Sequence, residues 1–334
     1  MADPIFEIKK YADDMSAVSG FLSYLPRSAA FSSLYTPPYF AWKIARNPFG
    51  PSAAFLRMRD GQAAAHCSVT AKPANAALLG GVHLAELGDT HTHPDFQRQG
   101  HFGILGRHTI EDFARAVGQP SLIYGLPNDN ALPGWLRHCG CEVFEPMQVR
   151  EMLRPIWRQP LSRLSFGGGG VHLERVVETA AASRAIDALW PRIALNGWLV
   201  EKSAAWWQWR YVASTQQYTT YLIHVDGAVA GWAVTHRTVS RWPLVGRTAV
   251  CDLVATTPAI EAEALRHLLS RVIGPFDFVT MWGQRGTVLD AAAIEAGFVP
   301  VRDVPVIFAK NSSWPLLESA AAPLRLSLGD TDNI

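Results

Sequence analysis

The sequence predicts an α/β fold made of two similar domains, and three observations lead to this prediction. The chain has 334 residues, more than the roughly 100 to 150 residues of a typical domain and enough for two. A run of glycines at 167–170 leaves the backbone free and supplies no side chains to pack, so it marks a boundary. The order of strands and helices before this run is repeated after it.

In the first half, apolar periodicity and turn residues predict each element in turn. The pair Asp60-Gly61 is typical of a hairpin turn. Residues 102–117 carry apolar side chains at three- and four-residue spacing, which predicts a helix, and Gly140 ends a shorter one. The expected elements are strand 5–11, helical material within 13–46, strands 53–59 and 62–70, strand 82–91, helix 102–117, strand 121–124, helix 130–138 and strand 142–153.

Spacings in the second half match those in the first. Trp42 precedes the turn residue Asp60 by 18 residues, and Trp209 precedes Asp226 of the turn Asp226-Gly227 by 17. A strand 218–225 and another after the turn are expected there, then helix 260–272, strand 276–281, helix 287–296 and a final strand. Duplicated domains explain this match best. The alternative is that the halves of any α/β chain could be aligned as loosely as this.

Similar spacing also relates Asp89 in the first half to Asp252 in the second, 29 and 26 residues past their turns. We therefore expect one domain at 1–165 and a second at 171–310. The remaining residues, 311–334, are expected to form a partly disordered tail.

Composition excludes some classes of function. Thirty Lys plus Arg balance 29 Asp plus Glu, giving a net charge of +1, so no electrostatic footprint for nucleic acid or an anionic membrane is expected. Four cysteines form no C-x-x-C pair, and no signal peptide or long apolar run occurs. We expect a cytoplasmic protein; a homo-oligomer is compatible with the sequence.

Polar chemistry is concentrated in residues 87–103, LGDTHTHPDFQRQGHFG. The Asp89-x-His91-x-His93 pattern by itself could supply two histidines and a carboxylate to a metal. The last of these histidines precedes Pro94 at the strand end, and no other loop supplies an obvious ligand cluster. We therefore predict no metal.

The second part of this segment, 97–103, runs directly into the predicted helix 102–117. The first amides of a helix have no internal partners and lie at the positive end of its dipole, so they attract anions. Glycine allows close approach of a phosphate, and Arg98 adds a mobile charge. The corresponding stretch of the second half, 256–261, has no glycine and an acidic residue at the helix start. Only the first domain is expected to bind an anionic ligand in this way.

At this point the sequence resembles the GNAT N-acetyltransferase superfamily, whose acyl-CoA pyrophosphate loop follows the pattern Gln/Arg-x-x-Gly-x-Gly/Ala. Residues 97–101 fit, whereas Phe102 departs at the last position and Gly103 follows it. Further likeness comes from DTHTHPDFQRQGHF (89–102), YGLPNDNALPGWLRHCGCEVF (124–144), WKIARNPFG (42–50) and WWQWRY (206–211). The last two resemble a tandem-GNAT subset that includes acyltransferases of nucleotide-linked amino sugars.

The resemblance implies two GNAT-like domains, each a mixed, mostly antiparallel sheet flanked by helices. Acetyl-CoA or another short acyl-CoA would bind the first domain where the fourth and fifth strands splay apart. Pantetheine would lie along the strand edge near His91, Thr92 and His93. The pyrophosphate would be held by Gln97, Arg98, Gln99, Gly100, His101, Phe102 and Gly103.

Asn128 and Asn130 match the asparagine position that commonly contacts the cofactor in this family. An ordinary Asx turn and helix cap at Pro-Asn-Asp-Asn is an equal alternative.

Acyl transfer to an amine needs a proton acceptor, because an alkyl ammonium has a pKa of about 10 and attacks only when neutral. We rank Asp89 and His91 ahead of Glu86, which lies eleven residues before Gln97. Strict alternation places Asp89, His91 and His93 on one face and Glu86 on the other, but a bulge would shift this phase. Asp89 and His91 pairing with each other, or with the neighbouring domain, is the competing explanation.

The resemblance thus predicts a GNAT-type N-acyltransferase whose acceptor is the primary amine of a small molecule, favouring a nucleotide-linked amino sugar. Trp207 and Arg210 either contact this acceptor or clamp the two domains by packing. Two alternatives stay open: acylation of another amine, such as an antibiotic, polyamine or peptide, and a non-catalytic acyl-CoA-binding protein.

Overall fold

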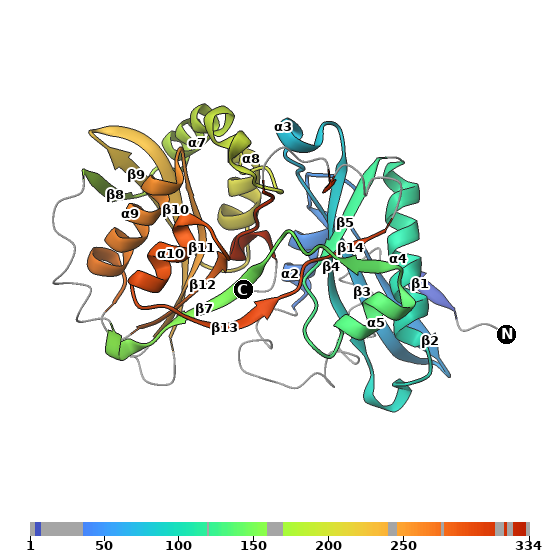
Figure 1. Cartoon of the computed structure of the whole chain (residues 1–334). Coiled ribbons are helices and arrows are strands. Elements are labelled where there is room, and N and C mark those ends of the chain that lie inside the picture. The colour runs from blue at the N-terminus through green and yellow to red at the C-terminus, as the bar shows by residue number, and fades with distance from the viewer. Residues whose placement is uncertain are drawn as a thin grey trace. The chain divides into compact units, whose positions relative to one another are not determined.

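A computed structural model describes residues 4–7, 36–118, 120–158, 170–239, 246–274, 277–310, 317–318 and 323–331. They form two compact units, each built on a seven-stranded sheet (Figure 1). The expected strand residues 8–11, the expected helical residues 13–35 and the glycines 167–169 lie outside the described residues. Within the described part, no helix is both long and apolar enough to cross a membrane.

The first unit has the strand order β1-β2-β3-β4-β5-β14-β6, in which only the β4–β5 pair is parallel. Helices α4 and α5 pack apolar side chains onto one face of this sheet. Its elements are β1 (Ile5–Glu7), α2 (Pro37–Phe40), the π-helical turn η1 (Ala41–Ala45), β2 (Ala53–Arg59), β3 (Gln62–Lys72), α3 (Ala76–Leu79), β4 (His83–Thr92), η2 (Pro94–Phe96), α4 (His101–Val117), β5 (Ser121–Gly125), α5 (Leu132–His138), β6 (Cys141–Val143) and β14 (Ile307–Ala309).

The second unit has the order β13-β7-β12-β11-β10-β9-β8, and again one pair, β11–β12, is parallel. Helices α9 and α10 cover one face, and α7 and α8 pack on the other. Its elements are β7 (Val149–Arg154), η3 (Ile156–Arg158), β8 (Val171–Arg175), α7 (Thr179–Ile193), η4 (Ala194–Asn196), α8 (Ala204–Trp207), η5 (Gln208–Val212), β9 (Thr219–Val225), β10 (Ala228–Val239), β11 (Gly246–Ala255), α9 (Pro258–His267), η6 (Leu268–Val272), β12 (Asp277–Gln284), α10 (Val288–Glu295), β13 (Val299–Val304) and η7 (Leu328–Asp330).

The predicted fold class, two mixed and mostly antiparallel sheets flanked by helices, is confirmed. The two predicted hairpin turns are also present. Asp60 and Gly61 have φ values of 49° and 77°, and Asp226 and Gly227 have 50° and 81°. Positive φ at both central residues is the requirement of the turn whose twist matches a two-residue hairpin.

One expected strand is divided between the two sheets. Residues 142–153 form β6 in the first sheet and β7 in the second, because Pro146 lies between them and lacks the N–H that a ladder needs. Conversely, β14 comes from near the end of the chain and lies between β5 and β6 of the first sheet. This position corresponds to that of β7 between β12 and β13 of the second sheet. The first unit therefore runs to Glu145 and resumes at Pro305, whereas the sequence placed the boundary near residue 165.

The expected tail is also partly incorporated. Residues 323–331 belong to the second unit, and Leu324, Leu326 and Asp330 are buried there. Apolar residues at alternate positions give this short segment a side to bury, which the Ala- and Leu-rich composition of the chain end concealed.

The exchanged strand β14 should be essential to the first unit. Phe308 is fully buried, and its ring lies 6.2 Å from Tyr124 and 5.7 Å from Phe144. Phe308→Ala should lower the free energy of unfolding by about 3–5 kcal/mol, measured by urea denaturation. Val301→Ala, at a residue of β13 that is 56% exposed, should change it by less than about 0.5 kcal/mol. Equal effects of the two variants would contradict this assignment.

Candidate functional site

The site predicted on β4 is shaped by a β-bulge. His66 pairs with His91 and Ser68 with Gly88, so two residues of β4, Asp89 and Thr90, oppose Cys67 alone. Asp89 has a positive φ of 47°, as the extra residue of a bulge often requires. The bulge that the sequence left open as the exception to strict alternation is therefore present, and its inserted residue reverses the phase of the strand beyond it.

The reversed phase places all three candidate bases on one face. Directly paired residues share a face, so Glu86 points the same way as Thr70, and His91 the same way as His66. The Asp89 carboxylate accepts a hydrogen bond from Ser68 on that face, 3.0 Å away. We call this the η1 face, because Lys43 of η1 reaches it; α4 packs on the opposite face.

At the bulge β4 and β5 part. Their parallel ladder ends at the pair Leu87–Gly125, but β4 continues to Thr92. Pro127 follows two residues after Gly125, and a proline cannot donate to a ladder. The splay expected between the fourth and fifth strands is thus a feature of this sheet, and the edge of β4 beyond Leu87 has no partner from β5.

A buried polar cluster surrounds the bulge. Lys43 Nζ lies 2.8 Å from Asp89 Oδ2, and the two side chains are 1% and 0% exposed. His66 Nδ1 lies 2.6 Å from the Asp89 carbonyl oxygen, so it carries the proton and donates. Sequence reasoning missed Lys43 and His66 as site residues. The repeated Trp-Lys and Trp-Arg pairs at 42–43 and 209–210 were the available signal for Lys43; His66 gave none.

Each carboxylate at this site forms an ion pair with a buried lysine. Burial acts to raise the pKa of Asp89, but the charges of Lys43 and nearby histidines outweigh it and hold that pKa below its usual range. Glu86 forms a second buried ion pair, with Lys72 Nζ 2.9 Å from its Oε2. Both carboxylates are therefore held by a buried lysine within the protein.

The histidines behave differently. Burial lowers the pKa of His91 to about 4, against the opposing effect of Asp89. Burial likewise lowers the pKa of His66. Both imidazoles are therefore neutral at pH 7, and His91 is the partly exposed one. His93 instead serves local structure, because its Nδ1 accepts a hydrogen bond from Asp95 N and caps η2.

The loop before α4 has backbone geometry suited to an anion. Arg98 and Gly100 have positive φ values of 62° and 80°, and Gly100 is the N-cap of α4. A Cβ built on Gly100 would meet no atom within 4 Å, so the surface there is open. Gln97, Arg98 and Gln99 are exposed. Turns of this kind aim successive amides outward, and the α4 dipole adds to their field.

Phe102 and Gly103 have a role that the loop motif did not suggest. The Phe102 ring packs 5.1 Å from that of Trp135 on α5. Gly103 lies inside α4, where an added Cβ would come within 2.7 Å of His138 Cβ. These two residues bring α4 and α5 together, and His101 beside them is buried. The bulky residue at the last motif position thus points toward α5.

The asparagines after β5 are partly accounted for by local structure. Asn128 Oδ1 accepts a hydrogen bond from Ala131 N at 2.9 Å, and the Asn128 carbonyl accepts one from Leu132 N. This local bond is of the capping kind that the sequence left as an alternative, although it reaches three residues along the chain and not the two of an Asx turn. Asn130 is exposed beside it.

Trp207 and Arg210 are packing residues of the second unit. Trp207 is 2% exposed and its indole donates to Thr220 Oγ1 at 3.0 Å. Arg210 is fully buried and donates to the carbonyls of Gly329 and Thr331. Their contact with substrate stays a prediction; the polar atoms named here bind other groups of the protein.

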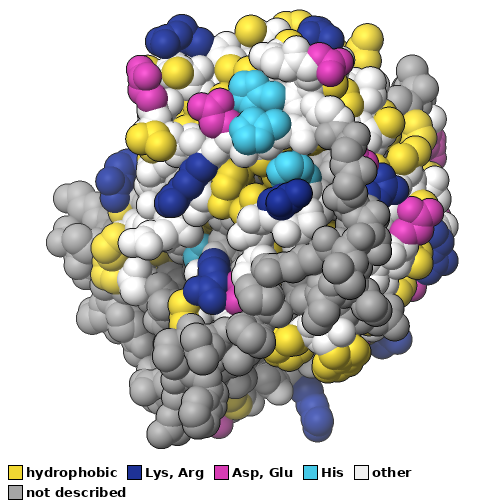
Figure 2. Space-filling view, turned by 90° about the vertical axis from the view of Figure 1, so that its left-hand side faces the viewer, with side chains coloured by type: hydrophobic (Ala, Val, Ile, Leu, Met, Phe, Trp, Pro, Cys, Tyr) yellow, Lys and Arg dark blue, Asp and Glu magenta, His cyan; other side chains and the backbone are white. Residues whose placement is uncertain are grey.

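A separate histidine group lies on the surface of the second unit. Histidine side chains gather on the face drawn in Figure 2, over β8, β9 and α9. The His172 ring lies 6.1 Å from that of His224 and 6.4 Å from that of His267. Among all described residues, however, no group of three His, Cys, Asp or Glu side chains is arranged to hold a metal ion.

Removing the cation of the buried pair should be costly. Lys43→Met should lower the free energy of unfolding by about 3–5 kcal/mol, because it leaves the Asp89 charge buried without its partner. The double variant Lys43→Met/Asp89→Asn should lose less than the single one. Urea denaturation of both at pH 7 measures the difference. A larger loss of unfolding free energy in the double variant would show that the effect of Lys43→Met does not come from the unpaired Asp89 charge.

Stability should also depend on His91 in mild acid. Above pH 6.5 His91 is neutral in both states; between pH 6.5 and about 4 the unfolded chain takes up a proton that the folded one does not. The free energy of unfolding therefore falls as the pH falls through this range. His91→Gln should make that fall shallower, measured by urea denaturation at pH 7.5, 6 and 5. An unchanged slope would contradict the lowered pKa.

Comparison with known proteins gives a match by structure alone. No protein-family model and no curated protein sequence matches the chain. A GCN5-related N-acetyltransferase from Anabaena variabilis aligns with a TM-score of 0.63 at 15% identity, over 91% of this chain and 72% of that one. A tandem GNAT protein from the clavulanic acid biosynthesis pathway gives 0.62 at 14%, over 92% and 100%. Saccharomyces cerevisiae N-myristoyltransferase with bound myristoyl-CoA gives 0.59 at 10%, over 98% and 86%. The chain therefore has the tandem GNAT fold.

Proposed function

We propose that this protein is an acyl-CoA-dependent N-acyltransferase whose first unit binds acyl-CoA and carries out the transfer. One observation supports this most: the neutral, partly exposed His91 lies at the opening where β5 leaves β4. Helix α4, whose N-cap Gly100 is exposed, begins ten residues later in the chain. A proton acceptor, a free strand edge and an anion-binding helix start are what direct acyl transfer from a thioester requires.

The residues fit the co-substrate that we propose, acetyl-CoA or another short acyl-CoA. The edge of β4 from Gly88 to Thr92 would pair with the pantetheine amides as an added strand does. The pyrophosphate would lie against the amides from Gln97 to Gly103, with Arg98 as counter-charge. Asn130 would contact the acyl-CoA as well. The Asn128 side-chain NH2 would also contact it, while Asn128 Oδ1 accepts the hydrogen bond from Ala131 N.

We assign the base to His91. The amine nitrogen of the acceptor attacks the thioester carbon, the C–S bond breaks, and the proton lost by nitrogen passes to the neutral imidazole, directly or through water. The CoA thiolate leaves and takes a proton from water, since α5 contains no tyrosine, and the His91 imidazolium returns its proton to the hydroxide so formed. Asp89 and Glu86, the other two candidates, hold Lys43 and Lys72 and fix the strand instead.

The acceptor that we propose is a small molecule with a primary amine. A nucleotide-linked amino sugar is the first to test, on the likeness of residues 42–50 and 206–211 to acyltransferases of such sugars. Antibiotics, polyamines and peptide amines form the comparison panel. Turnover with any of these amines supports the proposal.

Acyl-CoA should stabilise the folded chain, because a ligand that binds only the native state raises Tm. Arg98→Ala should weaken acetyl-CoA binding about tenfold, the loss of one exposed charge contact. Arg115→Ala, an exposed residue near the far end of α4, is the matched control and should bind normally. Thermal shift with an acyl-CoA panel measures both. No shift with any acyl-CoA would overturn the proposed function.

His91→Ala should lower kcat about 10²- to 10⁴-fold, the usual contribution of a general base, with KM for acyl-CoA within a few-fold. His83→Gln, at an exposed residue at the other end of β4, should leave kcat unchanged. Steady-state kinetics with an accepted amine measure this. Full acyl-CoA binding with no turnover of any amine by the unaltered chain would instead identify a non-catalytic acyl-CoA-binding protein.

A further inference from the structure

The second unit contains a groove built like the one beside β4. The parallel ladder of β11 and β12 ends at the pair Ala249–Thr280, but β11 continues to Ala255. A bulge lies at the aspartate here too: Val234 pairs with Asp252 and the next residue of β10 with Val250, so Cys251 is the extra residue. By strand order, β10, β11 and β12 correspond to β3, β4 and β5.

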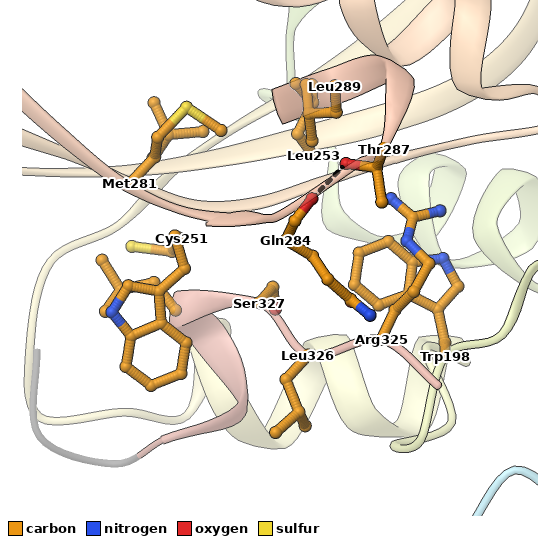
Figure 3. A pocket seen from close by; sticks show the side chains of 13 residues that line it. Trp198, Cys251, Leu253, Met281, Gln284, Thr287, Leu289, Arg325, Leu326 and Ser327 are labelled. Carbon is orange, nitrogen blue, oxygen red and sulfur yellow. Dashed lines mark hydrogen bonds between the residues drawn. The ribbon is translucent and has the colours of Figure 1, made fainter. Parts of the chain in front are cut away.

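This groove is filled by the chain itself. Residues 323–331, which we call the C-terminal strap, lie across it beside β12 and α10 (Figure 3). Arg325 forms a parallel bridge with Trp198, donating to Gly197 O at 2.7 Å and accepting from Leu199 N at 3.0 Å. Gln284 at the end of β12 donates to the Leu324 carbonyl at 2.7 Å. Only about 20 Å³ of cavity is left between strap and strands, room for one water molecule.

One basic side chain anchors the strap at the start of α9. Arg325 Nη2 lies 2.7 Å from Glu261 Oε2, and its guanidinium lies 4.2 Å from the centre of the Trp198 ring. Glu261 is fully buried, and its other oxygen faces Ala255 N at 3.4 Å. A carboxylate thus occupies the helix start that is open in the first unit, and Arg325 supplies its counter-charge.

The far end of the strap is held by a second buried group. Lys202 donates to Asp252 Oδ1 and to Ser327 Oγ, each at 2.9 Å, and pairs with Asp330. Gly329 lies against the Tyr211 hydroxyl so closely that no Cβ would fit. A main-chain bridge at Arg325, the Arg325–Glu261 ion pair and a contact that only glycine fits, at Gly329, together select the sequence Leu-Arg-Leu-Ser-Leu-Gly-Asp.

We propose that this groove is a peptide-binding site whose resident ligand is the C-terminal strap, and that the second unit consequently takes no acyl-CoA. The ligand class is an extended peptide with one arginine, recognised by main-chain hydrogen bonds to Gly197 and Leu199 and by the Glu261 carboxylate. The statement about acyl-CoA rests on the proposed function, whereas peptide recognition does not.

A cut in the folded chain tests the site. A recognition sequence for a specific protease is inserted after Ala320, and the full chain is folded before cleavage. The strap fragment should remain bound through gel filtration at micromolar concentration. The same cleavable chain carrying Arg325→Ala should release it after cleavage, whereas Arg302→Ala, which removes an exposed ion pair with Glu151, should retain it. Immediate loss of the unaltered fragment, or equal retention with Arg325→Ala, overturns the proposal.

Exchange and stoichiometry complete the test. A labelled synthetic peptide of residues 323–334 should replace the cut fragment, and its Arg325→Ala version should need at least about ten times the concentration. A scrambled peptide that competes as well as the native one overturns sequence recognition. Titration of the uncut chain should give one acetyl-CoA per chain. Two would contradict exclusion from the second unit; none would contradict the proposed function and leave the peptide site standing.

Discussion

The two-residue bulge in β4, held by the buried Lys43–Asp89 pair, is the constraint on which the candidate site depends. Without the bulge, His91 would turn to the face that α4 covers and would join the apolar core. Lys43 holds the Asp89 carboxylate, and His66 holds the carbonyl of the same residue. Two buried groups thus fix one backbone irregularity, and the direction of the His91 side chain follows from it. A buried pair of this kind contributes little net stability, but it specifies one register of the strand.

The two units share one architecture but differ at the start of the helix that follows the parting strands. Both sheets part at the same step of the strand order, and both carry an aspartate on the strand that continues. In the first unit the following helix begins at Gly100 with open space before it. In the second, Glu261 and the C-terminal strap fill the corresponding place. The first helix start is open, whereas the second already has its own carboxylate.

Local chemistry in the sequence predicted the parts that depend on neighbours along the chain. The turns at Asp60 and Asp226, the helix α4 and the duplicated order all follow from short-range patterns. The exchange of β7 and β14 could not be predicted, because the residues of a short strand do not indicate between which strands of which sheet it lies. Lys43, His66 and the strap were missed for the same reason: their partners lie 23 to 128 residues away. Parity failed for Glu86 and His91 because one bulge residue changes every face assignment after it.

Hydrogen exchange measured by mass spectrometry, with and without acetyl-CoA, tests the central claim most directly. Bound pantetheine and pyrophosphate would accept hydrogen bonds from backbone N–H groups of the β4 edge and of the α4 start. Peptides covering 88–104 should therefore exchange more slowly. Peptides covering 250–262 of the second unit should be unchanged. Slower exchange at 250–262 with none at 88–104 would contradict the assignment of acyl-CoA to the first unit.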